Sequence, residues 1–180
     1  VVAVTAVTSV GFFTDRIGLA MEQRSGELLG ADVRIESSTP VASVYRAKAT
    51  GEGLAVSRQA EFPSVILDTR GMPKLVAVKV VETGYPLRGR LRVSKQLFEE
   101  GEETDVVPES GTLWVASTLL AESGLQLGQS IKLGASFFRL TRVVSYEPDS
   151  TGIFSQLAAP RVMMNRIDLE AAELLSEASR

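Results

Sequence analysis

The chain has 180 residues, is 44% hydrophobic, and carries 19 Lys and Arg against 22 Asp and Glu, for a formal net charge of −3. This length allows one large domain or two small lobes, and the small negative charge argues against bulk binding of nucleic acid. The chain contains no Cys and no His. A cysteine nucleophile, a Ser-His pair, a thiolate or imidazole zinc site and a disulfide are therefore excluded.

Residues 1–14 (VVAVTAVTSVGFFT) carry no charged side chain. As a helix they would rise about 21 Å, which is short of the roughly 30 Å hydrocarbon core of a bilayer. They suit either the outer end of a transmembrane helix or an apolar core segment, because Val and Thr also favour strands. From Asp15 to Gly30 the sequence is polar with apolar residues at helical spacing, which favours a membrane helix that continues as a stalk.

Short strands and helices are expected along the rest of the chain. Strands are predicted at residues 33–36, 54–59, 64–68, 75–81, 113–115, 131–133, 137–144 and 161–165, and helices at 40–50, 116–123 and 166–175. Residues 75–81 (LVAVKVV) form the strongest strand, which is interrupted once by Lys79 and is expected to be central and buried. The mixed order predicts an α+β fold and not a doubly wound parallel sheet.

Three arginines, Arg88, Arg90 and Arg92, occupy alternate positions. On a strand they would share one face at a spacing of roughly 7 Å. One interpretation is a stripe that contacts acidic lipid headgroups or an acidic partner. The favoured alternative is a solvated strand face that is neutralised locally, because the acidic run EEGEETD follows at residues 99–105.

A second group of candidate contacts is aromatic. Phe137 and Phe138 are adjacent, so one ring points to each face of their predicted strand. Phe154 lies in an expected loop, and Tyr85 lies in a predicted turn. These residues are candidates for the edge of a hydrophobic groove or a partner contact. For Phe137, Phe138 and Phe154 the favoured alternative is a role in covering the core.

The sequence contains no motif for catalysis or nucleotide binding. G-x-S-x-G, G-x-x-x-x-G-K-[ST] and G-x-G-x-x-G do not occur. Two carboxylates are enough for glycoside hydrolysis, but no pattern in the chain supports such a pair, and a Ser-Lys nucleophile is equally unsupported. We therefore expect no enzyme activity and no catalytic, cofactor-binding or metal-binding residues, and a free-standing hydrolase is the least favoured hypothesis.

Short sequence pieces over nearly the whole chain match a family pattern. They are GFFTDR at 11–16, GAD at 30–32, FPS at 62–64, VKVV at 78–81, GYPLRG at 84–89, WVA at 114–116, LQLGQSIKLG at 125–134, EPD at 147–149 and APRVMMN at 159–165. In these pieces the chain resembles the MacB-like periplasmic core domain of ABC transporter permeases that have FtsX-like transmembrane helices. Within this superfamily it resembles the YbbP-like branch.

The resemblance implies a two-lobed domain with an N-terminal stalk helix. Residues 1–30 would hold the end of the first transmembrane helix and the stalk. A porter-like lobe would comprise residues 31–87 and 160–180, and a smaller inserted lobe would comprise residues 88–159. The stalk and the last helix would then lie side by side, because both return to the same membrane.

The resemblance also implies a function. The domain would lie on the periplasmic side of a bacterial inner membrane, in a permease that acts as a homodimer with a cytoplasmic ATPase subunit. It would transmit ATP-driven motion for the export or extraction of hydrophobic, lipid-like substrates, without cofactors or catalysis of its own. The alternative is a docking module for a periplasmic enzyme or adaptor protein, with Arg88, Arg90 and Arg92 as the contact.

Overall fold

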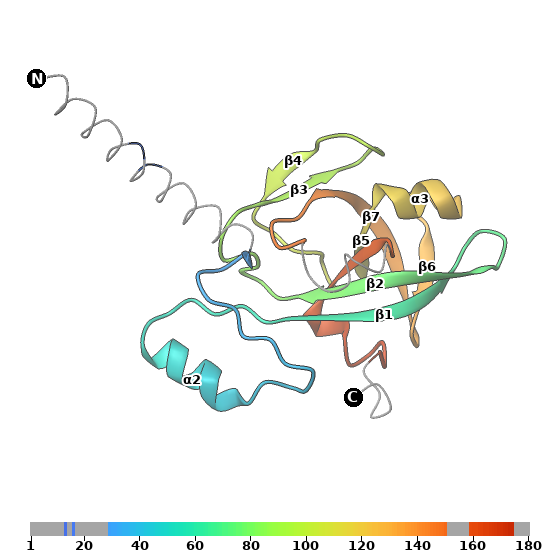
Figure 1. The fold of residues 1–180 in the computed structure, drawn as a ribbon. Helices are drawn as coiled ribbons and strands as arrows, with labels where there is room; N and C mark the ends of the chain where they lie inside the picture. Colours follow the sequence, from blue (N-terminus) through green and yellow to red (C-terminus); the bar gives the residue numbers. More distant parts are fainter. Residues whose placement is uncertain (1–12, 14–15, 17–28, 151–158, 175–180) are drawn as a thin grey trace, which may run out of the picture.

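A computed structural model describes residues 13, 16, 29–150 and 159–174. A large mixed sheet with two α-helices organises this part of the chain (Figure 1). The predicted segment 1–30 lies outside the described residues apart from Phe13, Arg16 and Leu29, which are helical, and Gly30, which is in a turn. Within the described part, no helix has both the length and the apolar character that a bilayer span requires.

The elements follow one another with short connections between most of them. In chain order they are α2 (Ser43–Gly51), β1 (Gln59–Leu67), β2 (Pro73–Val81), β3 (Leu91–Ser94), β4 (Glu102–Thr104), β5 (Thr112–Ala116), α3 (Ser117–Ser123), β6 (Ser130–Leu133), β7 (Ser136–Tyr146), β8 (Arg161–Asn165) and the 3-10 helix η2 (Arg166–Asp168).

The strands form one sheet in the order β1-β2-β8-β5-β7-β3-β4, and β6 pairs with β7 off this path. The pairs β2–β8 and β5–β7 are parallel, and the other pairs are antiparallel. This mixture of hairpins and parallel pairs, with helices between some strands, confirms the predicted α+β class. Strand β8, which comes late in the sequence, lies between β2 and β5.

Strand β2 is the buried central strand that its apolar run predicts, with Val76 to Val81 all buried. Its hairpin partner β1 is longer than expected and continues through Pro63, where two separate strands were predicted. Proline lacks an amide hydrogen, so it interrupts strands that need a partner on both sides. Because β1 ends the path of the sheet, Pro63 is tolerated there.

Two other sequence predictions are wrong. Residues 33–36 form no strand, and Arg34 instead pairs with Glu36 and with Asp149, which lies in a distant loop. The predicted helix at 166–175 is reduced, in its described part, to η2 and turns. Asp168 there accepts hydrogen bonds from residues 110 and 111, and Glu173 has a left-handed backbone with φ of 50°, which ends a right-handed helix.

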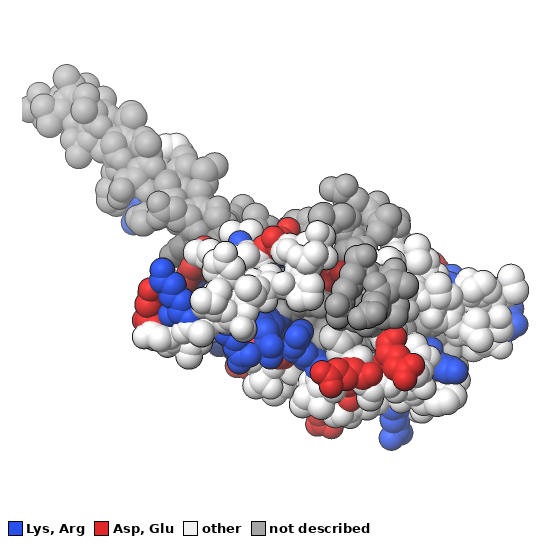
Figure 2. All heavy atoms as spheres, turned by 90° about the horizontal axis from the view of Figure 1, so that it is seen from below, with Lys and Arg blue, Asp and Glu red and all other residues white. Residues whose placement is uncertain are grey.

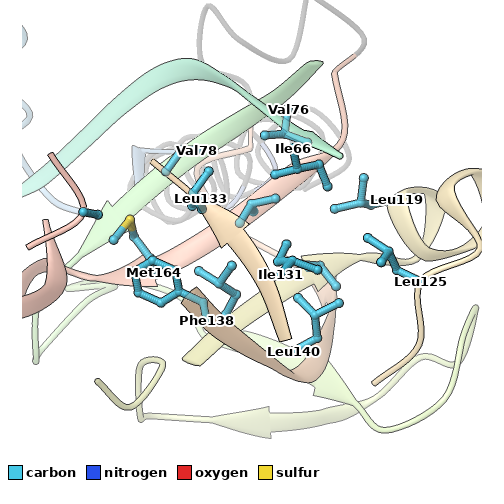
Figure 3. Packing of buried hydrophobic residues seen from close by; sticks show 14 of the residues in the cluster. Ile66, Val76, Val78, Leu119, Leu125, Ile131, Leu133, Phe138, Leu140 and Met164 are labelled. Atoms are coloured by element: carbon cyan, nitrogen blue, oxygen red, sulfur yellow. The ribbon is translucent and has the colours of Figure 1, made fainter. Parts of the chain in front are cut away.

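Apolar side chains cover both faces of the sheet. The larger cluster lies among β1, β2, β5, β6, β7, β8 and α3, where the labelled side chains point toward one another (Figure 3). The smaller cluster is on the other side of β2 and β8 and consists of Val81, Tyr85, Leu91, Val93, Val107, Trp114 and Met163. By contrast, α2 buries none of its residues and lies apart from the sheet in Figure 1.

Candidate functional site

The most unusual feature of the structure is a buried ionic cluster centred on Lys79. This side chain lies in the interior of β2 and is 0% exposed. Its Nζ atom lies 2.6 Å from Asp149 Oδ1 and 3.3 Å from Glu61 Oε1, and it also contacts Glu147 Oε1. A charge is costly to bury unless opposite charges compensate it, and here three carboxylates surround one ammonium group.

Two arginines complete the charge balance. Arg161, on β8, places Nη1 3.1 Å from Glu61 Oε2 and Nε 3.3 Å from Glu147 Oε2. Arg34 places Nη1 3.7 Å from Asp149 Oδ2. The cluster therefore contains three cations (Lys79, Arg161, Arg34) and three anions. Removal of any one member would leave another buried charge uncompensated.

The sheet register brings these residues together. Glu61 and Lys79 are directly opposite each other in the antiparallel pair β1–β2. Arg161 begins β8, whose parallel register aligns it with Ala77, two residues before Lys79 on β2. Residues two apart in a strand point to the same face, so the side chains of 61, 79 and 161 meet on one side of the sheet. Glu147 and Asp149 approach this side from the loop after β7.

Tyr85 closes the cluster from the turn after β2. The Lys79 ammonium lies 4.8 Å from the centre of its ring, within the range of a cation–π contact. Its hydroxyl donates a hydrogen bond to Asp149 and lies 3.3 Å from Glu147 Oε1. Burial, reinforced by the negative charges of Glu147 and Asp149, raises the pKa of Tyr85 far above its ordinary value. The hydroxyl therefore serves as a permanent donor.

The electrostatic environment favours the ionised forms of Asp149 and Arg161. Burial acts to raise the pKa of Asp149, but the charge and hydrogen bond of Lys79 and the hydrogen bond of Tyr85 outweigh it, so this pKa is lowered. Burial acts to lower the pKa of Arg161, but Glu147 and Glu61 outweigh it, and this pKa is raised. Both shifts favour charged groups that compensate each other at these two positions.

The three carboxylates also form the one grouping among the described residues that has the composition of a metal site. The ligand atoms of Glu61, Glu147 and Asp149 lie within 4.8 Å of one another. The Lys79 ammonium contacts an oxygen of each, so it takes the position that a cation would need. The cluster supplies its own counter-ion, and its residues do not fit a metal site while Lys79 is present.

A surface hollow of about 290 Å³ lies beside the cluster. Two cluster members, Glu147 and Arg161, form part of its wall, and the rest of the described lining comes from residues Val144, Ser145, Tyr146, Ser150 and Ala159. The wall mixes polar and apolar groups, and the described lining contains no pair of a nucleophile and a base in contact. The hollow gives access to the ionic cluster but offers no recognisable catalytic arrangement.

The segment that follows the predicted stalk is fastened to this site. Arg88 donates its backbone amide to Gly30 O at 2.9 Å and both Nε and Nη2 to the Asp32 carboxylate at 2.8 Å. Gly30 itself has φ of +65°, and a Cβ atom at this position would lie 3.3 Å from Asp149 Cβ. With the Arg34–Asp149 pair, residues 30–34 are held against both Arg88 and the cluster.

Of the arginines predicted as a stripe, Arg88 and Arg90 are exposed and Arg92 is half-buried, and all three pair with carboxylates. Arg88 pairs with Asp32, Arg90 pairs with Asp105 and Glu103, and Arg92 pairs with Glu100 and Glu103. Only Arg92 lies within β3, so the three do not share one strand face. The acidic run at residues 99–105 therefore neutralises Arg90 and Arg92, as expected, whereas the partner of Arg88 is Asp32, outside that run.

The aromatic candidates separate into different environments. Phe138 is buried in the main core and Phe137 is 70% exposed, as the alternation of strand faces predicts. Tyr85 is buried in the ionic cluster, not at the edge of a groove. Phe154 lies outside the described residues. Sequence analysis did not identify Lys79 as a site residue, although a single Lys in an otherwise apolar strand was the available signal.

Comparison with known proteins shows that, along its whole length, the chain is similar to a segment of an ABC transporter permease. The relative is the uncharacterized ABC transporter permease YbbP of Escherichia coli (strain K12). It is 31% identical over 180 residues, an alignment that covers 99% of this chain and 21% of the permease. The chain thus spans about a fifth of the length of this relative. No protein-family model matches the chain. The whole-chain similarity confirms the prediction of a domain related to ABC transporter permeases.

Proposed function

We propose that the chain is the extracytoplasmic domain of an ABC transporter permease in a bacterial cytoplasmic membrane. It transmits ATP-driven motion for the export or extraction of hydrophobic, lipid-like molecules and has no catalytic step of its own. The whole-chain similarity to a permease supports the transport role. ATP hydrolysis then belongs to a cytoplasmic ATPase subunit. The permease belongs to the YbbP-like branch and works as a homodimer.

The observation that carries this proposal is the fastening of residues 30–34 to the buried ionic cluster. A displacement at Gly30 acts on Asp149, because there is little free space between them: a Cβ added at Gly30 would lie 3.3 Å from Asp149 Cβ. Asp149 is in turn paired with Lys79 inside β2. Packed sheets and buried ion pairs do not deform gradually, so they pass a displacement on. Motion that arrives through the preceding stalk would thereby reach the sheet.

We further propose that the domain has the porter-like and inserted portions that the family resemblance implies, at residues 31–87 with 160–180 and at 88–159. In the described part, strands from both portions belong to one hydrogen-bonded sheet, joined where β8 pairs with β5. The ionic cluster also takes members from both, because Lys79 and Arg161 belong to the first and Glu147 and Asp149 to the second. Relative movement of the portions would strain this cluster first.

The test uses the full-length permease with its ATPase subunit in proteoliposomes. Arg88→Ala removes the ion pair with Asp32 at the surface and leaves every member of the buried ionic cluster in place. We expect ATP hydrolysis to continue while extrusion of a fluorescent lipid probe falls. The matched control is Arg90→Ala, which removes an equally exposed, ion-paired arginine and should preserve extrusion. Full extrusion by the Arg88 variant would contradict the proposal.

The docking-module alternative predicts a different result. If Arg88, Arg90 and Arg92 contact a periplasmic enzyme or adaptor, charge reversal at the three positions abolishes co-purification of that partner. Their pairing with nearby carboxylates reduces the positive charge that they offer to an acidic partner, which makes this the weaker candidate. Unchanged co-purification would rule out the docking-module alternative.

A further inference from the structure

Helix α2 contributes nothing to the core of its own domain. Within the described part of the chain none of its nine residues is buried, and no side chain caps its N-terminus. A helix of this length is marginal in water on its own, because most helical stability in proteins comes from packing of an apolar face. We therefore expect α2 to pack against a surface that this part of the chain does not supply.

The residues around α2 combine exposed apolar side chains with positive charge. The exposed apolar side chains, which are between 47% and 65% exposed, are those of Val41, Val44, Tyr45 and Leu54. Lys48 lies one helical turn after Val44 and Tyr45, so these three share one side of the helix. Arg46 and Lys48 against Glu52 leave a net charge of +1 at residues 41–54, which we call the basic arm. Figure 2 views the molecule from below, the side on which α2 lies in Figure 1, and shows basic side chains there.

A second exposed apolar surface, of opposite charge, surrounds the turn between β3 and β4. Its exposed apolar side chains are those of Leu97, Phe98 and Val106, at 42%, 71% and 57% exposure. Five carboxylates at residues 99–105 against Arg90, Arg92 and Lys95 leave a net charge of −2 around this turn. We call residues 95–106 the acidic tip.

Phe98 is held in a backbone conformation that a bulky residue rarely adopts. Its φ is 57°, in the left-handed region that is unfavourable for such side chains. The turn is fixed by hydrogen bonds from the Phe98 amide to Ser117 Oγ at 3.2 Å and from Ser94 Oγ to Glu99 Oε2 at 2.9 Å. Strained residues that their surroundings hold in place are common at binding sites. A fixed and exposed aromatic ring suits the anchor of a protein contact.

The basic arm and the acidic tip complement each other. Each combines exposed apolar side chains with net charge, and the two charges have opposite sign. Apolar contact with complementary charge is typical of specific interfaces. In Figure 1, α2 and the turn between β3 and β4 lie far apart, on opposite sides of the β1–β2 hairpin. The acidic tip of one chain therefore cannot cover the basic arm of the same chain.

We propose that the basic arm of one copy of this chain packs on the acidic tip of a second copy, with Phe98 as the anchor. Two copies related by a two-fold axis make this contact twice, because each copy contributes one arm and one tip. The proposal rests on the homodimer of the proposed function and names its contact in this domain. The extrusion assay tests transport, whereas the tests below need only the 180-residue chain, so either proposal can fail without the other.

The first test is disulfide cross-linking, because the chain has no Cys of its own. Val44→Cys places a thiol in the basic arm of one sample, and Leu97→Cys places a thiol in the acidic tip of another. Under mild oxidation the mixture should give a cross-linked dimer at least tenfold faster than either variant alone. Equal rates in the mixture and the single variants, or no cross-link, would overturn the proposal.

The second test exchanges charges between the two surfaces. Lys48→Glu places negative charge opposite the acidic tip, and Glu102→Lys places positive charge opposite the basic arm. Since the contact is made twice, each variant alone should dimerise about tenfold more weakly in sedimentation equilibrium. An equimolar mixture should recover the original affinity, because a mixed dimer pairs the reversed arm with the reversed tip. A mixture as weak as the single variants would count against the contact.

The third test separates the anchor from a structural role. Glycine adopts a positive φ readily, so Phe98→Gly should leave the midpoint of urea unfolding unchanged or raised, while dimerisation weakens about tenfold or more. The matched control is Phe137→Ala, since Phe137 is 70% exposed but lies outside both surfaces, and it should leave dimerisation unchanged. A chain that stays monomeric at all concentrations, or that both variants weaken equally, would mean that the basic arm has another partner.

Discussion

Lys79 Nζ and Asp149 Oδ1 lie 2.6 Å apart and join the interior of strand β2 to a loop 70 residues later in the sequence. The side chains of both are almost fully enclosed, at 0% and 1% exposure. Replacing a whole buried ion pair by apolar groups is often neutral, whereas removal of one partner is costly because the other charges remain uncompensated. The pair therefore fixes the position of the loop more than it adds net stability.

Lys79→Met is expected to destabilise the chain strongly. The substitution leaves three carboxylates with two arginines, and loss of one member of a buried ion pair costs about 3–5 kcal/mol of the free energy of unfolding. Urea denaturation followed by circular dichroism measures this quantity. The control is Lys74→Met, which removes a more exposed pair with Glu122 at 2.9 Å and should cost about 0–1 kcal/mol. Equal losses would show that Lys79 is not held as described.

The stability of the chain should depend on the ionisation of Asp149. Its pKa in the folded state is lowered, while the unfolded value is about 3.9. The stabilisation is therefore fully present above about pH 4 and is lost as the pH falls through the folded pKa. Asp149→Asn removes this contribution, so the difference in free energy of unfolding between the wild type and the variant should shrink as the pH falls below about 4. A difference that stays constant over this range would contradict the assignment.

Gly30→Ala should loosen the attachment of the N-terminal segment. The backbone at Gly30 is left-handed, and an added Cβ would also lie 3.3 Å from Asp149 Cβ. Gly53→Ala is the matched control, because its φ is +77° but nothing lies within 4 Å, so it reports backbone strain alone, about 1 kcal/mol. Hydrogen exchange of the Arg88 amide, which bonds to Gly30 O, measures the attachment. We expect the Arg88 amide to exchange faster in Gly30→Ala but not in Gly53→Ala. Equal exchange rates in the two variants would contradict the close approach of Gly30 to Asp149.

Adjacent phenylalanines in β7 should respond in opposite ways. Phe138 is 2% exposed and Phe137 is 70% exposed. Truncation of a buried Phe costs about 3–5 kcal/mol, whereas an exposed side chain away from special features contributes within about 0.5 kcal/mol. Phe138→Ala should therefore lower the midpoint of urea unfolding markedly and Phe137→Ala should not. Similar midpoints would mean that the register of β7 differs from the one described.

Local sequence patterns were sufficient for most of the sheet. The apolar run around Val78 predicts a central strand because burial on both faces removes the polar alternation. The helix α3 ends at Gly124, which has the left-handed φ of 71° that glycine adopts most easily. The two faces of β7 follow from the adjacency of Phe137 and Phe138.

The site could not be derived in the same way, because its members are far apart in the sequence. Lys79 meets Asp149 only after β8 has paired with β2 in parallel and the loop after β7 has returned to that side of the sheet. Spacing rules report neighbours within one element, so they indicated the evenly spaced Arg88, Arg90 and Arg92 and did not detect the residues that converge in space.

The position of β8 in the sheet has a consequence for biosynthesis. Translation proceeds from the amino end, so β2 and β5 are both synthesised before β8, the strand that lies between them in the sheet. Until residues 161–165 emerge, β2 and β5 each have one edge without a paired strand. Glu61 and Glu147 also lack Arg161, which contacts both of them in the folded domain. Open strand edges attract other chains. A nascent polypeptide of this kind would depend on chaperone protection, or on rapid completion, late in its synthesis.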